Sequence, residues 1–398
     1  MKNVSFFLCL AFVSTVCVGQ IQHVIVVIQE NRTPDNLFGS APPTGADVIA
    51  YGGPAQLSLG YSPSHSHTGF VQNAKNKWTS KAIMYVEQSE VQPYLDLAGQ
   101  YGFANRMFQT NQGPSTPAHQ FLFSGTSAAS ETSDLFESEV AGGCLSKAQV
   151  QFINPEGSED NWGSPCLNLT TMADLLDAAG VSWRYYVPNS ASIWNSPSDI
   201  QHICFPNGTE DKCYGSDWAN VNSNPLNVLS DITSGKLAQV SWVVPAAAYS
   251  DHPKLGGNGG PAWIASIVNA VGQSSYWNNT AILVTWDDWG GFYDHVAPLA
   301  NNTGWCPSYC YGFRVPLLMI SAYTPANCID NTTYDFGSIL RYIEDVFSLP
   351  SLGQADKYAN SLSAGGCFSG TQQRAFKAIS SRSLTKREMA SHDDPDDD

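Results

Sequence analysis

The chain has 398 residues, of which 43% are hydrophobic, 12% aromatic and only 14% charged. Such a composition can bury a large core, so it excludes a globally disordered protein and fits one large domain or two ordinary ones. The formal net charge of −16 gives no basic footprint for nucleic acid, and an anionic membrane would repel it. Residues 393–398 carry five of the negative charges, so the body of the chain is less acidic than the total suggests.

The N-terminus has the layout of a secretory signal peptide. Lys2 supplies a positive charge, residues 6–13 form an apolar run, and Gly19 offers a small residue for cleavage. We therefore expect residues 1–19 to be removed and the mature protein to be secreted, outside the cell or into a periplasm. No other apolar run is long enough to span a bilayer, so we expect no transmembrane segment in the mature chain.

Strand-like and helix-like segments alternate along the mature chain. In order, the sequence predicts a strand at 23–28, a helix at 172–179, strands at 181–187 and 239–244, a helix at 263–271, strands at 281–285 and 315–320, and a helix at 336–347. This alternation predicts an α/β fold with a mostly parallel central sheet flanked by helices. Residues 40–80 and 190–235, rich in Gly, Pro, Ser and Asn, are expected to be ordered, loop-rich insertions over the sheet edge.

The cysteines predict a disulfide-bonded protein. Ten cysteines, less Cys9 and Cys17 in the signal peptide, leave eight, and an even number in an exported chain indicates disulfides. Short loops favour two pairs, Cys144 with Cys166 and Cys204 with Cys213. The pairing of the other four stays open, with a zinc site as the alternative: Cys306, Cys310, Cys328 and Cys367.

Two polar clusters follow predicted strands. Glu30 and Asn31 come after the first strand, and Asp287 and Asp288 come after the strand at 281–285. In parallel sheets the chemistry gathers at the carboxyl ends of the strands, so we expect these side chains to converge on one ion. Three carboxylates and an amide oxygen are hard ligands that suit Mg²⁺, Ca²⁺ or Mn²⁺.

A hydroxyl pair and several histidines complete the candidate site. Ser115 and Thr116 lie in a proline-bounded turn at 113–119, and a cation beside a hydroxyl makes it a better nucleophile. We expect Ser115 to be the nucleophile, because Thr116 precedes a proline, which favours an extended backbone that turns its side chain away. Transfer of a phosphoryl group also needs donors to the equatorial oxygens and an acid for the leaving group. His252, His65 and His295 are the candidates for these roles, and His67 and His119 rank below them.

The sequence resembles the phosphoesterase family of bacterial and plant phospholipases C and related acid phosphatases, within the alkaline-phosphatase-like superfamily. The matching segments are 27–32, 113–115, 251–253 and the long run 285–296, TWDDWGGFYDHV. This resemblance implies one divalent metal ion held by Glu30, Asn31, Ser115, Asp287 and Asp288. It also implies that His65 and His252 lie at the phosphate, with Asp251 beside His252.

These observations together predict an alkaline-phosphatase-like phosphoesterase. Residues 20–376 are expected to form the catalytic domain, and the polar segment 377–398 a disordered acidic tail. Ser115 would attack phosphorus to give a phosphoseryl intermediate, with His252 and Asp251 as catalytic residues and His65 and His295 binding the substrate. The favoured substrate is a phosphodiester such as a phospholipid headgroup. The alternatives are an acid phosphatase acting on phosphomonoesters and a non-catalytic exported binding protein on the same scaffold.

Overall fold

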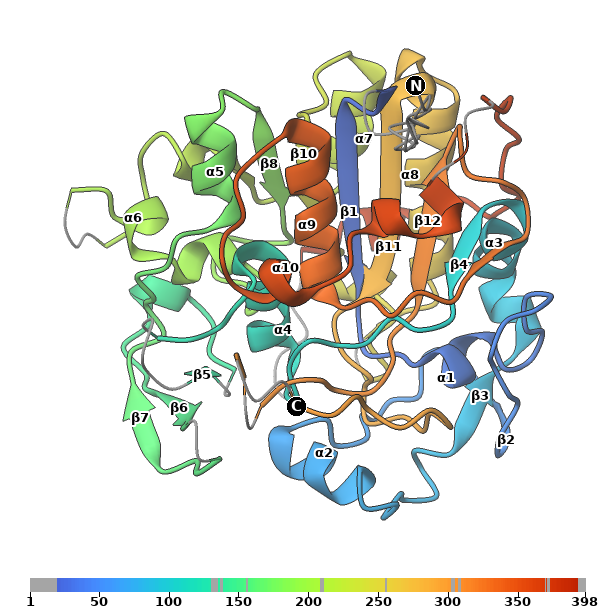
Figure 1. Cartoon of the computed structure of the whole chain (residues 1–398), viewed down its shortest axis with the longest axis horizontal. Coiled ribbons are helices and arrows are strands. Elements are labelled where there is room, and N and C mark those ends of the chain that lie inside the picture. Colours follow the sequence, from blue (N-terminus) through green and yellow to red (C-terminus); the bar gives the residue numbers. More distant parts are fainter. Residues whose placement is uncertain are drawn as a thin grey trace, which may run out of the picture.

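The computed structural model describes residues 20–392, except 130–134, 137–138, 155–156, 208–210, 255, 302–304, 307–308, 369 and 371–372. The predicted signal peptide, 1–19, lies outside the described residues. An eight-stranded sheet runs through the described part of the chain (Figure 1). Its strands are β1 (His23–Gln29), β4 (Gly102–Ala104), β8 (Trp183–Tyr186), β9 (Val221–Asn222), β10 (Val240–Val243), β11 (Thr280–Trp286), β12 (Leu317–Ser321) and β13 (Cys328–Asp330).

The strand order across this sheet is β13-β4-β12-β11-β1-β10-β8-β9. β1 pairs in parallel with β10 and β11, and the pairs β10–β8, β8–β9 and β13–β4 are also parallel. β12 runs antiparallel to both of its neighbours, β11 and β4. The predicted α/β architecture with a mostly parallel sheet is therefore confirmed. The direction of β12 could not be predicted, because a buried apolar run reads the same in either direction.

Two further small sheets lie outside the central one. They consist of β2 (Gly53–Ala55) with β3 (Met84–Val86), and of β5 (Leu135–Phe136), β6 (Val150–Ile153) and β7 (Asn161–Gly163). The helices are α1 (Pro34–Phe38), α2 (His67–Asn73), α3 (Gln88–Gln100), α4 (Ser115–Ser124), α5 (Met172–Ala178), α6 (Gln201–Cys204), α7 (Asn227–Thr233), α8 (Gly260–Gly272), α9 (Phe336–Phe347), α10 (Ala355–Tyr358) and α11 (Lys386–Met389).

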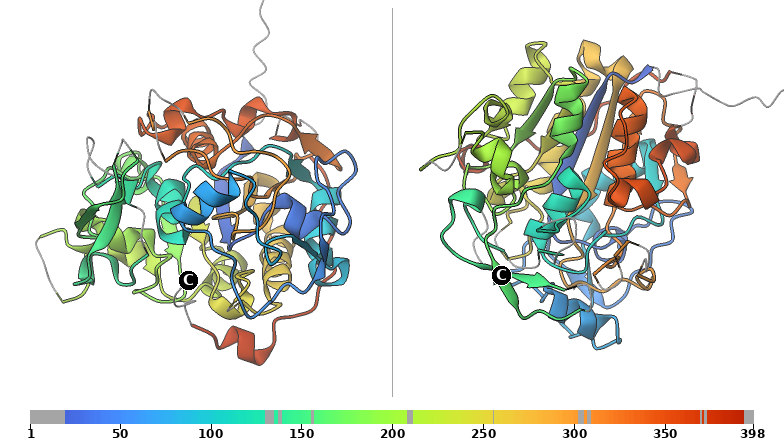
Figure 2. Two further views of the ribbon diagram at one scale, coloured as in Figure 1. Left: turned by 90° about the horizontal axis from the view of Figure 1, so that it is seen from below. Right: turned by 60° about the vertical axis from the view of Figure 1, so that its left-hand side comes forward.

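Helices cover the two faces of the central sheet. α8 contacts α3 and α7, whereas α4 contacts α5 and α9, and Figures 1 and 2 show these two groups on opposite faces. The core strands β1 and β11 are buried along nearly their whole length because both faces are covered. α9 begins where it was predicted, since Asp335 and Ser338 cap each other's backbone N–H groups in a capping box.

The two predicted insertions contain regular structure. Residues 190–235 include α6, α7 and β9, which extends the sheet beyond β8, and residues 40–80 include β2 and α2. Residues 377–392, expected to belong to a disordered tail, are instead placed in the structure and include α11. Residues 393–398 lie outside the described residues. Ile379 and Leu384 are buried, and Ile379 exchanges two hydrogen bonds with the Asn269 side chain on α8. Apolar side chains within this polar segment anchor it to the domain.

All eight cysteines of the predicted mature chain are paired. The structure contains the disulfides Cys144–Cys166, Cys204–Cys213, Cys306–Cys310 and Cys328–Cys367. The two predicted pairs are confirmed, and the four open cysteines form disulfides and not a zinc site.

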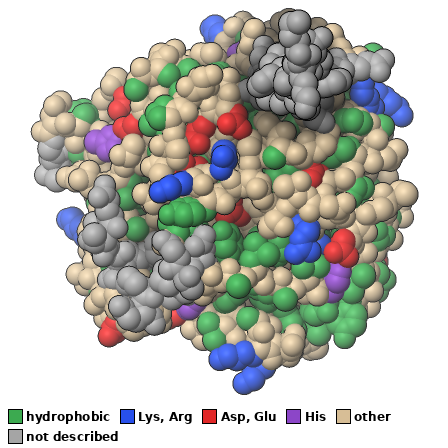
Figure 3. Space-filling model, in the orientation of Figure 1, with side chains coloured by type: hydrophobic (Ala, Val, Ile, Leu, Met, Phe, Trp, Pro, Cys, Tyr) green, Lys and Arg blue, Asp and Glu red, His purple; other side chains and the backbone are tan. Residues whose placement is uncertain are grey.

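On the face drawn in Figure 3, Lys and Arg side chains lie at scattered positions. None of the described helices is both long and apolar enough to cross a membrane.

Candidate active site

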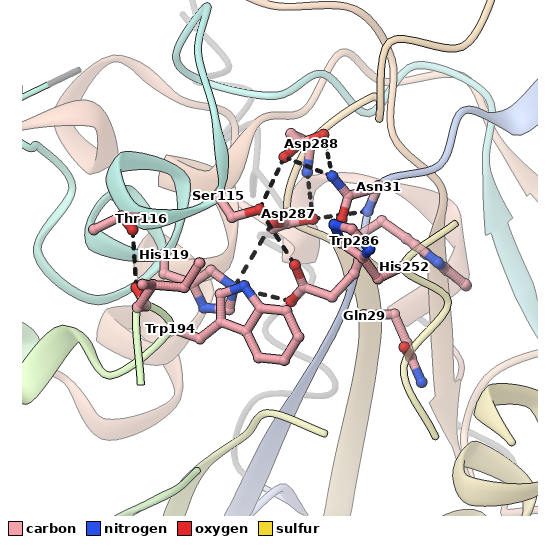
Figure 4. A network of polar contacts seen from close by, with 12 residues as sticks. Gln29, Asn31, Ser115, Thr116, His119, Trp194, His252, Trp286, Asp287 and Asp288 are labelled. Atoms are coloured by element: carbon pink, nitrogen blue, oxygen red, sulfur yellow. Dashed lines mark hydrogen bonds and ion pairs between the residues drawn. The ribbon is translucent and has the colours of Figure 1, made fainter. Parts of the chain in front are cut away.

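The pairing of β1 with β11 joins the two acidic clusters. These parallel strands are in register, with Gln29 opposite Trp286, so Glu30 and Asn31 emerge beside Asp287 and Asp288. The pairing continues past the strand ends, because the Asp287 N–H donates to Gln29 O at 2.9 Å and the Arg32 N–H donates to Asp288 O at 3.0 Å. The four side chains are buried at the carboxyl edge of the sheet, and Figure 4 shows Asn31, Asp287 and Asp288 lying together.

Asn31 is held in a left-handed backbone conformation, with φ of 62°, which asparagine tolerates better than most residues. Its N–H donates to Asp287 Oδ1 at 2.9 Å. Gly290 lies directly behind it, also with a positive φ, and a Cβ at that position would fall 2.1 Å from Asn31 O. A glycine is therefore required where the turn after β11 crosses the backbone of Asn31.

The orientation of the Asn31 side chain follows from His65. His65 Nδ1 lies 3.0 Å from the Pro63 carbonyl oxygen, which accepts only, so Nδ1 carries the hydrogen. In the neutral ring Nε2 is then an acceptor, and it accepts from Asn31 Nδ2 at 3.1 Å. Asn31 Nδ2 also donates to Asp288 at 3.3 Å. Its Oδ1 therefore faces away from both partners, buried and with no hydrogen-bond partner among the described residues.

The two carboxylate oxygens of Asp287 also differ in their hydrogen bonds. Its Oδ1 accepts from the backbone N–H groups of Asn31 and Asp288, at 2.9 and 2.7 Å. Its Oδ2 is buried and has no hydrogen-bond partner in the described part of the chain. Asp288 Oδ1 accepts from the Gly290 N–H at 2.5 Å. The backbone of the turn thus fixes both carboxylates and leaves Asp287 with one oxygen available to a ligand.

Ser115 brings a hydroxyl into this cluster from α4. Its Oγ lies 3.3 Å from Glu30 Oε2 and 3.2 Å from Asp288 Oδ2. The Thr116 hydroxyl donates instead to the Ile193 carbonyl at 3.0 Å, away from the carboxylates. The expected extended backbone at Thr116 is wrong, because α4 already begins at Ser115. Pro117 is tolerated there since its missing N–H falls in the first helical turn, where no partner is required.

His119 is the site residue that the sequence analysis missed. Its Nε2 lies 3.1 Å from Glu30 Oε1 and 3.8 Å from Asp287 Oδ2, and all three side chains are buried. Its spacing of four from Ser115 was the available signal, since residues i and i+4 share one face of a helix. Burial lowers the pKa of His119 to about 4, so the ring is neutral at pH 7.

The electrostatics of the cluster favour a bound cation. Two effects raise the pKa of Glu30 well above its usual value. Burial is the larger effect, and the negative charge of the nearby Asp287 carboxylate is the second. In the part of the chain that the structure describes, neither Glu30 nor Asp287 pairs with a lysine or arginine. Buried like charges of this kind are stable when a metal ion neutralises them.

The donors present fit such an ion. Asn31 Oδ1 and Asp287 Oδ2 are buried oxygens that have no hydrogen-bond partner among the described residues, and both belong to this cluster. Carboxylate, amide and hydroxyl oxygens are hard ligands of the type that Mg²⁺, Ca²⁺ and Mn²⁺ prefer. The cluster of Glu30, Asn31, Ser115, Asp287 and Asp288 is therefore a candidate metal centre.

Asp251 has a different environment from the one expected. Its Oδ2 accepts from the Tyr94 hydroxyl and from Trp286 Nε1, each at 2.9 Å. Its backbone N–H donates to Gln29 Oε1, and its carbonyl accepts from the Arg32 guanidinium. Burial raises the pKa of Asp251 to about 6. These contacts tie the loop that carries His252 to the ends of β1 and β11, and the catalytic role expected for Asp251 stays a prediction.

The structure separates the remaining predicted histidines. Figure 4 draws His252 with the residues around Asn31, consistent with the ties of its neighbour Asp251. His295 instead contacts a different pair of carboxylates. Its Nδ1 lies 2.8 Å from Asp35 Oδ2 and its Nε2 lies 3.1 Å from Asp47 Oδ1, next to an ion pair of Arg314 with Asp294. Both ring nitrogens of His295 are thus engaged by carboxylates outside the cluster, and its role in binding substrate stays a prediction.

A serine at the start of a helix faces a buried oxygen-donor cluster at the carboxyl edge of a parallel sheet, and together they form a candidate hydrolase centre whose donors could hold a metal ion. Residues 55–350 match the phosphoesterase family, and the chain belongs to that family. Its members hydrolyse phosphoric esters, as the resemblance of the sequence had implied.

Curated relatives with similar sequences are phospholipases C. The non-hemolytic enzyme of Burkholderia pseudomallei is 23% identical over 412 residues, covering 83% of this chain and 56% of the relative. The hemolytic enzyme of Pseudomonas aeruginosa is 23% identical, covering 85% and 54%. Phospholipase C B of Mycobacterium tuberculosis is 25% identical, covering 83% and 74%. The chain thus spans little more than half the length of the first two relatives.

Two solved structures are similar to this chain at low sequence identity. The lipoteichoic acid synthase LtaP from Listeria monocytogenes gives a TM-score of 0.46 at 9% identity, covering 88% of this chain and 77% of that one. A protein in the alkaline phosphatase superfamily from Vibrio parahaemolyticus gives 0.41 at 12% identity, covering 86% and 71%.

Proposed function

We propose that this chain is a secreted, metal-dependent phosphoesterase that cleaves phosphodiesters in the manner of a phospholipase C. The observation that carries the proposal is the Ser115 hydroxyl, whose Oγ lies 3.3 Å from Glu30 Oε2 and 3.2 Å from Asp288 Oδ2 inside a buried oxygen-donor cluster. A hydroxyl held between carboxylates has a base within reach of its proton. The family supplies the reaction class, hydrolysis of an ester at phosphorus.

One divalent cation completes this proposal, with Ca²⁺, Mg²⁺ and Mn²⁺ as the candidates. Glu30, Asn31, Ser115, Asp287 and Asp288 would hold it. Two buried oxygens in that set, which lack a hydrogen-bond partner in the described part of the chain, support the assignment. When bound, the cation would lower the pKa of the hydroxyl and offset negative charge on the phosphoryl oxygens.

The proposed chemistry has two displacements at phosphorus. In the first, Ser115 Oγ bonds to phosphorus, its proton passes to a facing carboxylate, and the bond to the leaving alcohol breaks. His252 donates a proton to that alcohol, and a phosphoseryl intermediate remains. In the second, a water molecule loses a proton to His252 and attacks phosphorus. The bond from phosphorus to Oγ then breaks, Ser115 recovers its proton, and the phosphoalcohol leaves.

The remaining residues act through these groups. His65 orients the Asn31 amide by accepting its N–H, and its contact with a phosphoryl oxygen stays a prediction. Asp251 fixes the His252 loop through Trp286 and Gln29. The names of the curated relatives support a phospholipid headgroup diester as the substrate class. The disulfides support the proposed export of the protein, because disulfides persist in oxidising compartments.

The test uses the protein depleted of metal with a chelator. A chromogenic choline phosphodiester and a chromogenic phosphomonoester are assayed while Ca²⁺, Mg²⁺ and Mn²⁺ are restored one at a time. We expect one of these ions to restore diester hydrolysis in the wild type and not in Ser115→Ala. Restoration of monoester hydrolysis alone would identify a phosphatase. Tight metal binding with neither activity would identify a binding protein and contradict the proposal.

A further inference from the structure

His119 stands one turn along α4 from Ser115, and its ring reaches the same carboxylate as the serine does. Nε2 lies 3.1 Å from Glu30 Oε1, while the Ser115 Oγ lies 3.3 Å from Oε2 of the same side chain. The ring is fully buried and stacks on Trp194, with an interplanar angle of 21°. Figure 4 shows His119 and Ser115 approaching the cluster from the same helix.

Two roles fit this position, namely a nitrogen ligand of the cation and a hydrogen-bond donor to Glu30. The second ring nitrogen distinguishes between them. A histidine that ligates a metal through Nε2 carries its hydrogen on Nδ1, and that N–H almost always donates to a carboxylate, carbonyl or water. His119 Nδ1 is buried, and no described residue offers it a partner. As a ligand, His119 would therefore leave a buried N–H group unsatisfied, which costs about 1–3 kcal/mol.

The other tautomer lowers this cost, because a buried acceptor without a partner is better tolerated than a buried N–H group without one. With the hydrogen on Nε2, the donor meets Glu30 Oε1 at 3.1 Å, and Nδ1 carries no hydrogen that would need an acceptor. His65 in the same site shows the opposite arrangement, because its Nδ1 donates to the Pro63 carbonyl and leaves Nε2 as the acceptor. The two histidines thus hold the two proposed ligands that follow β1, His65 by accepting from Asn31 and His119 by donating to Glu30.

We propose that His119 is a positioning residue, and not a metal ligand, which donates from Nε2 to Glu30 Oε1 and so directs Oε2 toward the metal centre and Ser115. The inference rests on the proposed function. In this arrangement α4 fixes the spacing between Ser115 and His119, and each of them contacts one oxygen of the Glu30 carboxylate. Partners of this kind typically change metal affinity or activity by about 10- to 100-fold when removed.

The experiment compares His119→Gln with His119→Phe in the full chain. Glutamine can place an N–H donor near the position of Nε2, whereas phenylalanine keeps the aromatic packing on Trp194 and removes the donor. Mn²⁺ affinity is measured by calorimetry on metal-depleted protein, without substrate. We expect His119→Phe to bind Mn²⁺ about 10- to 100-fold more weakly than the wild type, and His119→Gln to recover most of that loss. His202→Phe, at a half-buried histidine on α6, is the control and should match the wild type.

A spectroscopic measurement separates positioning from ligation. In the Mn²⁺-loaded wild type, we expect electron spin echo spectra without the strong ¹⁴N coupling of a directly bound imidazole. Such a coupling, lost in His119→Gln, would overturn the inference, as would equal Mn²⁺ affinity in His119→Phe and the wild type, or equal losses in both variants. A wild-type protein that binds no divalent cation would overturn the proposed function as well, whereas the preceding outcomes leave that function standing.

Discussion

At the scale of single residues, the site depends on which of two adjacent hydroxyls faces the carboxylates. Ser115 and Thr116 both lie in the first turn of α4, yet the Ser115 Oγ approaches Glu30 and Asp288, while the Thr116 hydroxyl is engaged by the Ile193 carbonyl. Successive helical positions differ by about 100° around the axis, because a turn takes 3.6 residues. The helix therefore directs only one of the pair at the candidate metal centre.

The first prediction follows from this difference. Ser115→Ala should lower kcat by at least about a thousandfold because the covalent route is lost, with a smaller change in substrate binding. Thr116→Ala should lower kcat by about tenfold through the lost bond to Ile193, which helps to position the start of α4. Both are measured by steady-state kinetics, and acid quench followed by phosphopeptide mapping should find phosphate on Ser115. Phosphate on Thr116 would contradict the assignment.

At the scale of elements, the turn after β11 is the part of the site with the least freedom. Gly290 and Gly291 both have positive φ, and each passes close to a neighbouring backbone. Gly290 packs on Asn31, and a Cβ on Gly291 would fall 2.6 Å from the Ser64 carbonyl oxygen, next to His65. This turn therefore sets the distance between the ends of β1 and β11 and the loop that carries His65.

The second prediction tests this close approach. Gly290→Ala should strongly destabilise the fold and weaken Mn²⁺ binding, since its Cβ would lie 2.1 Å from Asn31 O. Gly353→Ala is the matched control, because Gly353 has a φ of +84° but nothing within 4 Å of its would-be Cβ. It should cost only about 1–2 kcal/mol from the left-handed conformation and leave Mn²⁺ affinity unchanged. Urea unfolding and calorimetry measure both effects. Equal behaviour of the two variants would mean that the contact with Asn31 is unimportant.

At the scale of the whole molecule, buried carboxyl groups couple stability to pH. Burial raises the pKa of Asp199 to about 8 and that of Asp335 to about 7, and it raises the pKa of Glu344 to about 8. Asp199 accepts from Gln120 Nε2 at 2.9 Å and so links the segment after β8 to α4. A group whose pKa is higher in the folded state than in the unfolded state keeps its proton longer when folded. Its contribution to stability is complete below the unfolded pKa and is lost as the pH rises through the folded pKa.

The third prediction isolates Asp199. Its unfolded pKa is about 3.9, so the free energy of unfolding of the wild type should fall between about pH 4 and pH 8, by at most about 1.4 kcal/mol per pH unit from this group. Asp199→Asn does not titrate, so its stability relative to the wild type should grow across that range. Urea titrations at pH 5, 7 and 9 measure the difference, with exposed Asp211→Asn as the control. An Asp199→Asn profile parallel to that of the wild type would refute the shift.

The sequence by itself determined the class of fold and most members of the site. Buried apolar runs ending in polar pairs located β1 and β11 and the clusters that follow them, because hydrophobic patterning and chain order are local properties. The pairs Cys144–Cys166 and Cys204–Cys213 also followed from short loops. Ser115 and the four acidic or amide residues converge as the patterns indicated, and their roles as nucleophile and ligands stay predictions.

Only the tertiary structure decided which side chains contact one another across long separations. The register of β1 against β11 places Glu30 beside Asp287, and helix packing brings His119 onto Glu30. The spacing of four between Ser115 and His119 indicates a shared helix face but not the carboxylate that this face meets. The same packing gives His295 to Asp35 and Asp47, turns Asp251 toward Tyr94 and Trp286, and pairs Cys328 with Cys367. Contacts of this kind depend on where whole elements pack, because a buried polar group takes whichever partner the packing brings within hydrogen-bond distance.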